Sequence, residues 1–125
     1  MKKILIIDDD QFFPKTLEVA LPKDKYTIIT AEDGNVGLVK LASEKPDLII
    51  LDLMMPNMDG TAFLKKLKDS PELPRPPILV SSNLSSVKKI SDVMALGAVG
   101  YVIKSDESMQ SIVADIERIM GEKNT

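Results

Sequence analysis

Short apolar runs alternate along this chain with longer stretches in which apolar residues recur at helical spacing. Continuous apolar runs of four or five residues are typical of strands buried on both faces, and the longer stretches are typical of amphipathic helices. The pattern predicts strands at 3–7, 26–30, 47–51, 77–81 and 99–103, and helices at 11–21, 34–44, 60–69, 86–96 and 106–120. Such alternation favours an α/β fold, a doubly wound parallel sheet of five strands with five helices.

The length of the chain suits one domain. With 125 residues it can bury roughly two thirds of its unfolded surface, which is enough for a core. We expect this domain to cover residues 1–121 and the tail at 122–125 to fray after Gly121, which stops the last helix.

The first predicted helix has a core stripe that carries Phe13 and Leu17 four positions apart. Phe12 and Val19 lie off this stripe, and we expect them to pack at the edge of the core rather than to form a docking patch. Asp10 precedes the helix and is expected to cap its amino terminus.

The composition excludes several kinds of chemistry. The chain has no cysteine and no histidine, so it lacks disulfides, thiolate metal sites and the commonest general base. Its net charge of −3, with no long run of one sign, argues against direct binding of nucleic acid. No apolar run approaches the roughly 18 residues of a membrane helix, so we expect a soluble cytoplasmic protein.

Polar residues follow four of the predicted strands at the point where each strand ends. They are Asp8, Asp9 and Asp10 after the first strand, Asp52 after the third, Ser81 and Ser82 at the end of the fourth, and Lys104 after the fifth. Open parallel sheets bind ligands at the carboxyl ends of their strands. One pocket could therefore hold several acids, a hydroxyl and an amine.

Asp8, Asp9 and Asp52 would come close together if the first and third strands are neighbours. Two like charges ~4 Å apart repel by about 4 kcal/mol at an effective dielectric of 20. Lys104 can offset one charge and a divalent cation two, and an oxygen-only ligand set suits Mg²⁺. A lone aspartate at a strand end is commonly a cap or turn residue, which is our interpretation of Asp10, but acids that converge from two strands favour an ion site.

Asp52 can also act as a nucleophile, because a carboxylate can accept a phosphoryl group to form an acyl phosphate. Such a transfer needs the phosphoryl charge to be neutralised, which Mg²⁺ and Lys104 could do, while a hydroxyl at the end of the fourth strand donates to a phosphoryl oxygen. The chain has no Ser-His pair, no GxGxxG and no P-loop, which removes acyl transfer, dinucleotide binding and ATP binding of those types.

With these residues considered together, the chain resembles the receiver domains of two-component response regulators, especially the stand-alone chemotaxis type. The resemblance covers residues 2 to 120 and lies in three motifs that occur in order. They are Ile-Asp-Asp-Asp at 7–10, Asp-Leu-Met-Met-Pro-Asn-Met-Asp-Gly at 52–60 and Gly-Ala-Val-Gly-Tyr-Val-Ile-Lys at 97–104. It implies a flavodoxin-like sheet of strand order 2-1-3-4-5.

The resemblance also implies a role for each matching residue. Asp52 would be the phosphoacceptor, and Lys104 would contact the phosphoryl group. Asp8 and Asp9 would be the acid pair for Mg²⁺, with Asp9, Asp52 and the Met54 carbonyl as direct ligands. The switching hydroxyl maps to Ser82 rather than Ser81, because Ser82 keeps the family's spacing to Asp52 and Lys104, and Tyr101 matches the aromatic residue coupled to it.

The chain departs from the family pattern at a few positions. Ser105 follows Lys104 where proline is usual, and Asn83 follows Ser82 where a small residue is usual. The positions that tend to steer the hydrolytic water are Met54 and Leu84, and both are apolar. We therefore hypothesise that a phosphorylated protein would dephosphorylate itself slowly.

As implied by the resemblance, a sensor histidine kinase or phosphotransfer protein would phosphorylate Asp52. The surface formed by the fourth helix, fifth strand and fifth helix would then change and be read by a downstream protein or a fused output domain, or it would pair two copies. The expected residues of that surface are Lys88, Lys89, Asp92, Tyr101 and Met109. On this interpretation the chain is a switch rather than an enzyme.

Two other functions remain open at this point. A docking module that keeps the fold without being phosphorylated is compatible with Ser105 and Asn83, although the full set of acids, hydroxyl and lysine argues against it. A phosphotransferase or hydrolase of the haloacid-dehalogenase type would need an aspartate two positions after the nucleophile, where Met54 stands, and a cap domain that does not fit in 125 residues.

Overall fold

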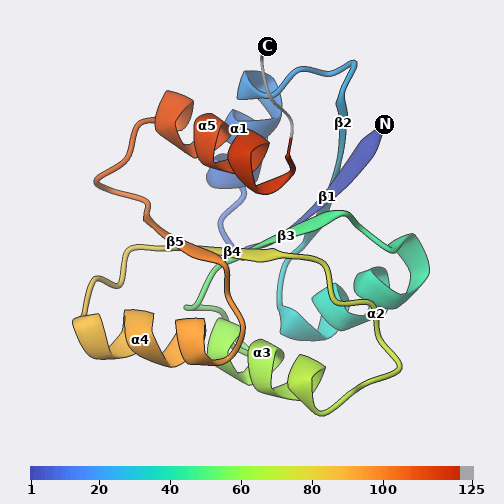
Figure 1. Ribbon diagram of the computed structural model, residues 1–125, viewed down its shortest axis with the longest axis vertical. Helices are drawn as coiled ribbons and strands as arrows, with labels where there is room; N and C mark the ends of the chain where they lie inside the picture. The colour runs from blue at the N-terminus through green and yellow to red at the C-terminus, as the bar shows by residue number, and fades with distance from the viewer. Residues whose placement is uncertain (122–125) are drawn as a thin grey trace.

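A parallel five-stranded sheet in the order β2-β1-β3-β4-β5 forms the centre of the molecule (Figure 1). A computed structural model describes residues 1–121, so the expected fraying of 122–125 lies outside the described residues. The strands are β1 (Lys2–Ile7), β2 (Tyr26–Ala31), β3 (Leu48–Leu51), β4 (Ile78–Ser82) and β5 (Gly100–Ile103). The predicted fold class is confirmed.

Five helices cover the two faces of the sheet (Figure 1). They are α1 (Phe12–Ala20), α2 (Gly34–Glu44), α3 (Gly60–Lys68), α4 (Val87–Ala95) and α5 (Met109–Ile119). Helices α1 and α5 lie on one face, and α2, α3 and α4 lie on the other. The sheet is therefore buried on both sides, which explains why its strands are continuous apolar runs.

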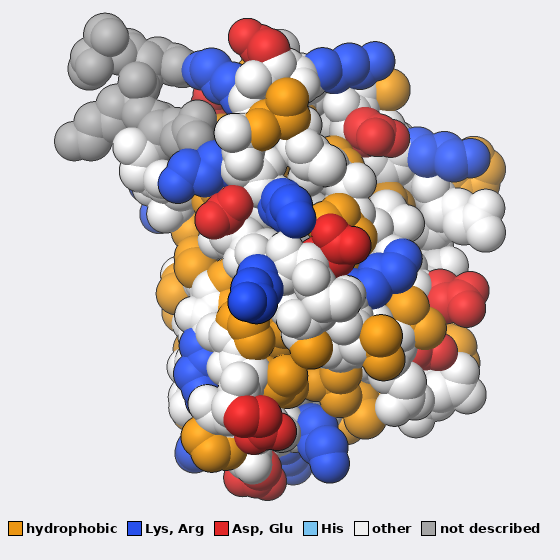
Figure 2. Space-filling model, turned by 90° about the vertical axis from the view of Figure 1, so that its right-hand side faces the viewer, with side chains coloured by type: hydrophobic (Ala, Val, Ile, Leu, Met, Phe, Trp, Pro, Cys, Tyr) orange, Lys and Arg blue, Asp and Glu red, His pale blue; other side chains and the backbone are white. Residues whose placement is uncertain are grey.

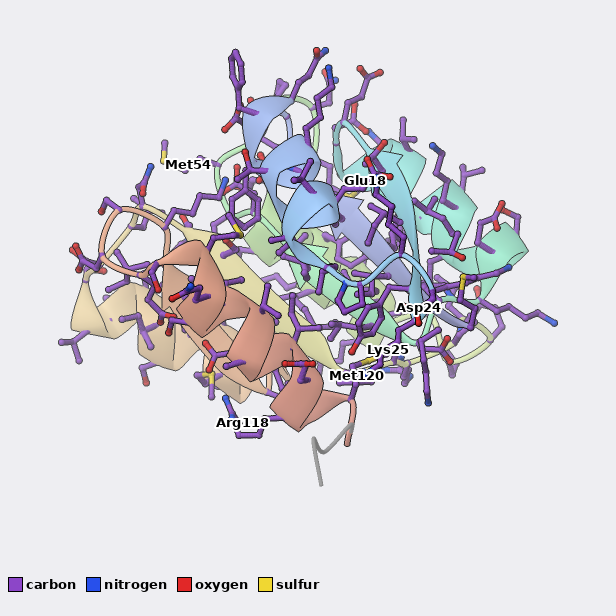
Figure 3. All side chains as sticks on the ribbon, turned by 90° about the horizontal axis from the view of Figure 1, so that it is seen from above. Glu18, Asp24, Lys25, Met54, Arg118 and Met120 are labelled. Carbon is purple, nitrogen blue, oxygen red and sulfur yellow. The ribbon has the colours of Figure 1, made fainter. Side chains whose placement is uncertain are left out.

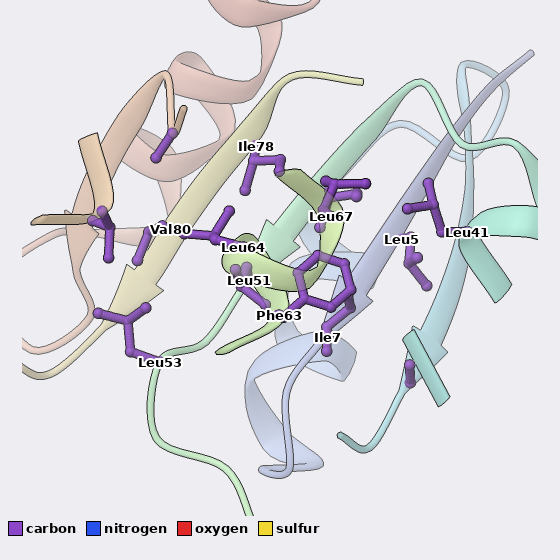
Figure 4. Close-up of a cluster of buried hydrophobic side chains, with 14 residues drawn as sticks. Leu5, Ile7, Leu41, Leu51, Leu53, Phe63, Leu64, Leu67, Ile78 and Val80 are labelled. Atoms are coloured by element: carbon purple, nitrogen blue, oxygen red, sulfur yellow. The ribbon is translucent and has the colours of Figure 1, made fainter. Parts of the chain in front are cut away.

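Alternate residues of each central strand contribute to two separate cores. Leu5 and Ile7 of β1 point into the core beneath α2, α3 and α4, where Phe63 is fully buried (Figure 4). Ile4 and Ile6 point to the other face, where they pack with Leu17 and residues of α5. This alternation determines on which side of the sheet the residue after each strand emerges.

Side-chain caps decide where several helices begin. The side chains of Asp33, Asp59, Ser86 and Ser108 each accept a backbone N–H in the first turn of the helix that follows. The last helix was expected from residue 106, but it begins at Met109, because Ser108 is its cap and the N–H of Asp106 donates to the Ile103 carbonyl in a turn.

The expectation that Phe12 and Val19 would pack at the edge of the core was wrong. Their side chains are 82% and 79% exposed. The stripe through Phe13 and Leu17 faces the sheet, and Phe12 and Val19 lie on the side of α1 that faces solvent. Asp10 does accept a hydrogen bond from the Phe12 N–H at 2.9 Å, although Gln11 occupies the cap position itself.

Charges of both signs are interspersed on the face that carries α2 and β2 (Figure 2). Neither Lys and Arg nor Asp and Glu gather into a stripe on this face, and apolar side chains lie between them. Among residues 1–121, no helix is both long enough and apolar enough to cross a membrane.

We expect Phe63→Ala to lower the free energy of unfolding by about 3–5 kcal/mol, because it removes a fully buried ring from the core beneath α3. Phe12→Ala removes the same ring from an exposed site and should change stability by no more than about 0.5 kcal/mol. Urea unfolding of both variants measures the difference. Equal effects of the two substitutions would contradict the burial assigned here to these rings.

Candidate functional site

The carboxyl ends of β1, β3, β4 and β5 bring the predicted site residues together. The N–H of Asp52 donates to the Ile7 carbonyl at 2.9 Å, which continues the β1–β3 pairing by one residue and sets Asp52 next to Asp8. The N–H of Lys104 donates in the same way to the Ser82 carbonyl at 2.9 Å. Regular strand pairing therefore positions the site.

Asp8, Asp9 and Asp52 form a cluster in which one carboxylate oxygen of each residue lies within 4.8 Å of the others. Asp8 and Asp52 are buried, whereas Asp9 is exposed to solvent. Oxygen donors from two strands, open to solvent on one side, fit a hard cation such as Mg²⁺ that keeps several of its waters. The carbonyl of Met54, which was expected to be a direct ligand with Asp9 and Asp52, belongs to the second residue after Asp52, and the Met54 N–H lies 3.5 Å from Asp52 Oδ1.

Burial and like charge make the two buried acids weaker than ordinary aspartates. Burial raises the pKa of Asp52 to about 6, and the neighbouring Asp8 carboxylate adds to the shift. Burial also raises the pKa of Asp8, even though the Lys104 ammonium and the Asp10 N–H act against the rise. A positive charge placed among these carboxylates therefore stabilises their ionised forms.

Lys104 supplies one such charge. Its Nζ lies 2.6 Å from Asp8 Oδ2, and its side chain is only 14% exposed. The Nζ also lies 4.6 Å from the centre of the Phe13 ring, within the range of a cation–π contact. Phe13 was expected only as a core residue, and no feature of the sequence pointed to its contact with Lys104.

Ser82 and Tyr101 both bond to Leu84. Ser82 Oγ, fully buried, accepts the Leu84 N–H at 3.2 Å, and the Tyr101 hydroxyl donates to the Leu84 carbonyl at 2.6 Å. Burial raises the pKa of the Tyr101 phenol. Ser81, the alternative hydroxyl, is buried too, but its Oγ has no hydrogen-bond partner among the described residues.

Several depressions lie around the acid cluster and Lys104, and two of them are lined by further residues of the expected site. One, of about 390 Å³, is lined by Asp9, Met54, Leu84, Lys89 and neighbouring residues. Met54 is 63% exposed and projects at one end of the molecule, away from Asp24, Lys25 and Met120 (Figure 3).

The other depression, of about 340 Å³, reaches Lys104. Its lining includes Phe13, Asn83, Ser105 and the half-buried Met109. Asn83 and Ser105, which differ from the usual family residues, therefore both lie beside Lys104 in this depression. The remaining residues of the expected interaction face, Lys88 and Asp92, form an exposed ion pair of 3.1 Å on α4.

The contact of Asn57 with Asp33, in the loop after β3, was not predicted from the sequence either. Asn57 Nδ2 donates to Asp33 Oδ2 at 2.9 Å and so joins the loop after β3 to the start of α2. An aspartate just before a helix signals a cap, but nothing in the sequence indicated its second partner.

Comparisons with known proteins agree with this geometry. Residues 4–117 match the family described as the response regulator receiver domain. The chain belongs to the family of response regulator receiver domains. The resemblance to receiver domains that the sequence motifs indicated is therefore confirmed.

Individual relatives support the same assignment. The receiver domain is 33% identical over 126 residues to the protein-glutamate methylesterase/protein-glutamine glutaminase 1 of Oleidesulfovibrio alaskensis, covering 98% of this chain and 34% of that protein. It is 37% identical over 103 residues to the alkaline phosphatase synthesis transcriptional regulatory protein PhoP of Bacillus subtilis, covering 82% of this chain and 42% of that protein. The chain thus spans between a third and half of the length of these curated relatives.

Among solved structures, the chemotaxis protein CheY4 of Vibrio cholerae superimposes with a TM-score of 0.84 at 28% identity, covering 95% of this chain and 98% of that chain. Receiver domains are signalling domains of two-component systems that interact with histidine kinases and output domains, and they bind Mg²⁺ at an acidic pocket. The cluster of Asp8, Asp9 and Asp52 is a group on this chain that could hold the ion.

Because the pKa of Asp52 is raised, we expect that replacing its carboxylate increases the free energy of unfolding by an amount that depends on pH. Because the folded-state pKa of about 6 exceeds the ordinary 3.8, the stability that Asp52 contributes is complete at low pH and is lost as the pH rises through 6. As the pH rises from 4 to 7, the free energy of unfolding of Asp52→Asn should therefore increase relative to that of the wild type by on the order of 2 kcal/mol, allowing for partial solvent screening.

Urea unfolding in the presence of EDTA at several pH values measures this gain. Asp24→Asn, at the far end of the molecule, controls for the loss of one negative charge (Figure 3). A difference between Asp52→Asn and wild type that stays constant with pH would show that Asp52 has an ordinary pKa.

Proposed function

We propose that this receiver domain, residues 1–121, takes a phosphoryl group onto Asp52 from a histidine kinase or a phosphotransfer protein. The observation that carries the proposal is the setting of Asp52, a residue that is 7% exposed and whose carboxylate shares one cluster with Asp8 and Asp9. Lys104 bonds to Asp8 in the same cluster, so its positive charge lies beside the acceptor. These are the groups that phosphoryl transfer to a carboxylate requires.

Asp52 must be ionised to act as the nucleophile. Since pH 7 lies above its pKa of about 6, most molecules carry the carboxylate at that pH. One of its oxygens attacks the phosphorus, the P–N bond to the donor histidine breaks, and the donor imidazole keeps the electron pair. Asp8, Asp9, Asp52 and the Met54 carbonyl would hold Mg²⁺, which supplies neutralisation of charge on the phosphoryl oxygens when bound.

Lys104 can contribute to the same reaction without leaving its place. Its ammonium group donates one hydrogen bond to Asp8 and has two further donors, one of which can reach a phosphoryl oxygen on Asp52. The contact with the Phe13 ring and the burial of most of the Lys104 side chain limit the positions that the amine can occupy.

The bonds through Leu84 connect the acceptor to the surface. A Ser82 side chain that rotates to bring its hydroxyl to the phosphoryl group moves Oγ away from the Leu84 N–H and breaks the bond between them. The Leu84 carbonyl transmits this change to Tyr101, which donates to it. Phosphorylation thus favours a second arrangement of the face formed by α4, β5 and α5.

That face, represented by Lys88, Lys89, Asp92, Tyr101 and Met109, would be read by a downstream protein or by an output domain of the same chain, and it could also pair two phosphorylated copies. We place the protein in the cytoplasm and propose no direct contact of this domain with nucleic acid or membrane. The domain assists its own phosphorylation and dephosphorylation but turns over no separate substrate. No observation favours the non-phosphorylated docking module, because none of the expected site groups is missing.

Intact mass after incubation with acetyl phosphate and Mg²⁺ tests the proposal. We expect one phosphoryl adduct on the wild type and none on Asp52→Ala. Circular dichroism of the variant establishes that it is folded. A folded wild type without an adduct, or an equal adduct on the variant, would exclude Asp52 as the acceptor.

We expect the phosphoryl group to be lost slowly, because Met54 and Leu84 offer no side-chain polar group to orient a hydrolytic water. The adduct should persist for minutes or longer after the phosphodonor is removed in the presence of Mg²⁺. Met54→Asn adds one hydrogen-bonding group at an exposed position and should speed the loss about tenfold. Met54→Leu is the matched apolar control, and loss from the wild type within seconds would refute the argument.

A further inference from the structure

The loop from Asp52 to Asp59 is fastened at the end nearest the sheet by its own backbone. The N–H of Gly60 donates to the Leu53 carbonyl at 3.0 Å. A side chain at Gly60 would collide with the Asp52 carbonyl, so only glycine permits this close approach. These contacts hold the beginning and end of the loop together, and Met55 and Met58 pack against the core beneath it.

The tip of the loop is a tight and costly turn. Asn57 has a φ of 67°, and the Met58 N–H donates to the Pro56 carbonyl at 2.7 Å across it. A residue other than glycine at positive φ persists when its surroundings hold it there. The surroundings of Asn57 include one strong contact, the 2.9 Å bond from its Nδ2 to Asp33 Oδ2.

Asp33 is a rigid point of attachment for this bond. The residue is 7% exposed, and its other carboxylate oxygen accepts the Val36 N–H at 2.9 Å, which caps α2. The bonds from Val36 and then from Asn57 lower the pKa of Asp33, so it accepts as a carboxylate at neutral pH. The backbone adds a second tie, because the Gly34 N–H donates to the Met58 carbonyl at 3.3 Å and Met58 occupies the space that a Gly34 side chain would fill.

We propose that Asp33 and Asn57 are positioning residues that hold the loop carrying Met54 in the shape required for Mg²⁺ binding, and that ion binding in turn tightens the first turn of α2. The inference rests on the proposed metal site of Asp8, Asp9, Asp52 and the Met54 carbonyl. Met54 lies between the fastened base of the loop and its clamped tip, so the position of its carbonyl depends on both. Coupling between two sites acts equally in both directions.

Asn57→Gly tests the clamp with little risk to folding, since glycine adopts positive φ freely while losing the bond to Asp33. Isothermal titration calorimetry with Mg²⁺, without any phosphodonor, should give a dissociation constant about fivefold or more above that of the wild type. Ser111→Ala is the matched control, because it removes an exposed 2.9 Å bond to the Glu107 carboxylate on α5. It should bind Mg²⁺ as the wild type does.

A donor–acceptor swap tests whether the bond itself matters. The double variant Asp33→Asn with Asn57→Asp keeps the net charge and the cap on Val36 while reversing the pair. It should restore Mg²⁺ affinity to within about twofold of the wild type. As a second readout, Mg²⁺ should slow hydrogen exchange of the Val36 N–H in the wild type and have little effect on it in Asn57→Gly.

The outcomes separate this inference from the proposed function. Wild-type Mg²⁺ affinity in a folded Asn57→Gly, a loss that the swapped pair does not restore, or no Mg²⁺ binding by the wild type would each overturn the clamp. A clamp effect on Mg²⁺ binding in a protein that never takes up a phosphoryl group would leave the clamp standing and refute phosphorylation of Asp52. Phosphoryl uptake by the wild type, together with an Mg²⁺ affinity that Asn57→Gly does not change, would refute the clamp and leave phosphorylation of Asp52 standing.

Discussion

The parallel pairing of β1 with β3 forces two buried carboxylates, Asp8 and Asp52, to lie side by side at the edge of an apolar sheet. Carboxylates in this position repel each other and lose hydration at the same time. Among the described residues, Lys104 offers a positive charge in compensation, with a side chain that is 14% exposed. The raised pKa values of both carboxyl groups follow from that imbalance, which favours a further positive charge, such as that of a divalent cation, among the carboxylates.

Lys104 depends on parts of the fold that are far apart in the sequence. Its partner Asp8 lies at the end of β1, 96 positions away, and the ring above its Nζ belongs to α1. Ser105 and Asn83 differ from the usual family residues, yet both line the entrance to Lys104 and neither belongs to the carboxylate cluster. These departures therefore lie beside the amine and not among the carboxylates.

Polar contacts lead away from the acid cluster in two directions. Towards α4 and β5, Leu84 bonds to Ser82 through its N–H and to Tyr101 through its carbonyl. Towards α2, Asn57 and Met58 bond to Asp33 and Gly34. The first set of contacts joins the end of β4 to β5, and the second joins the loop after β3 to the start of α2.

The sequence by itself determined the strands to within one residue at either end, because strands buried on both faces are unbroken apolar runs. It also placed acids, a hydroxyl and a lysine at the strand ends, where a parallel sheet gathers its functional groups. It was less successful where packing decides: Phe12 and Val19 proved exposed, and α5 begins at Met109 because of the Ser108 cap. Only the tertiary structure decided the contact of Phe13 with Lys104 and the bond of Asn57 to Asp33, since the distance between segments far apart in the chain depends on how the layers pack and not on any local pattern.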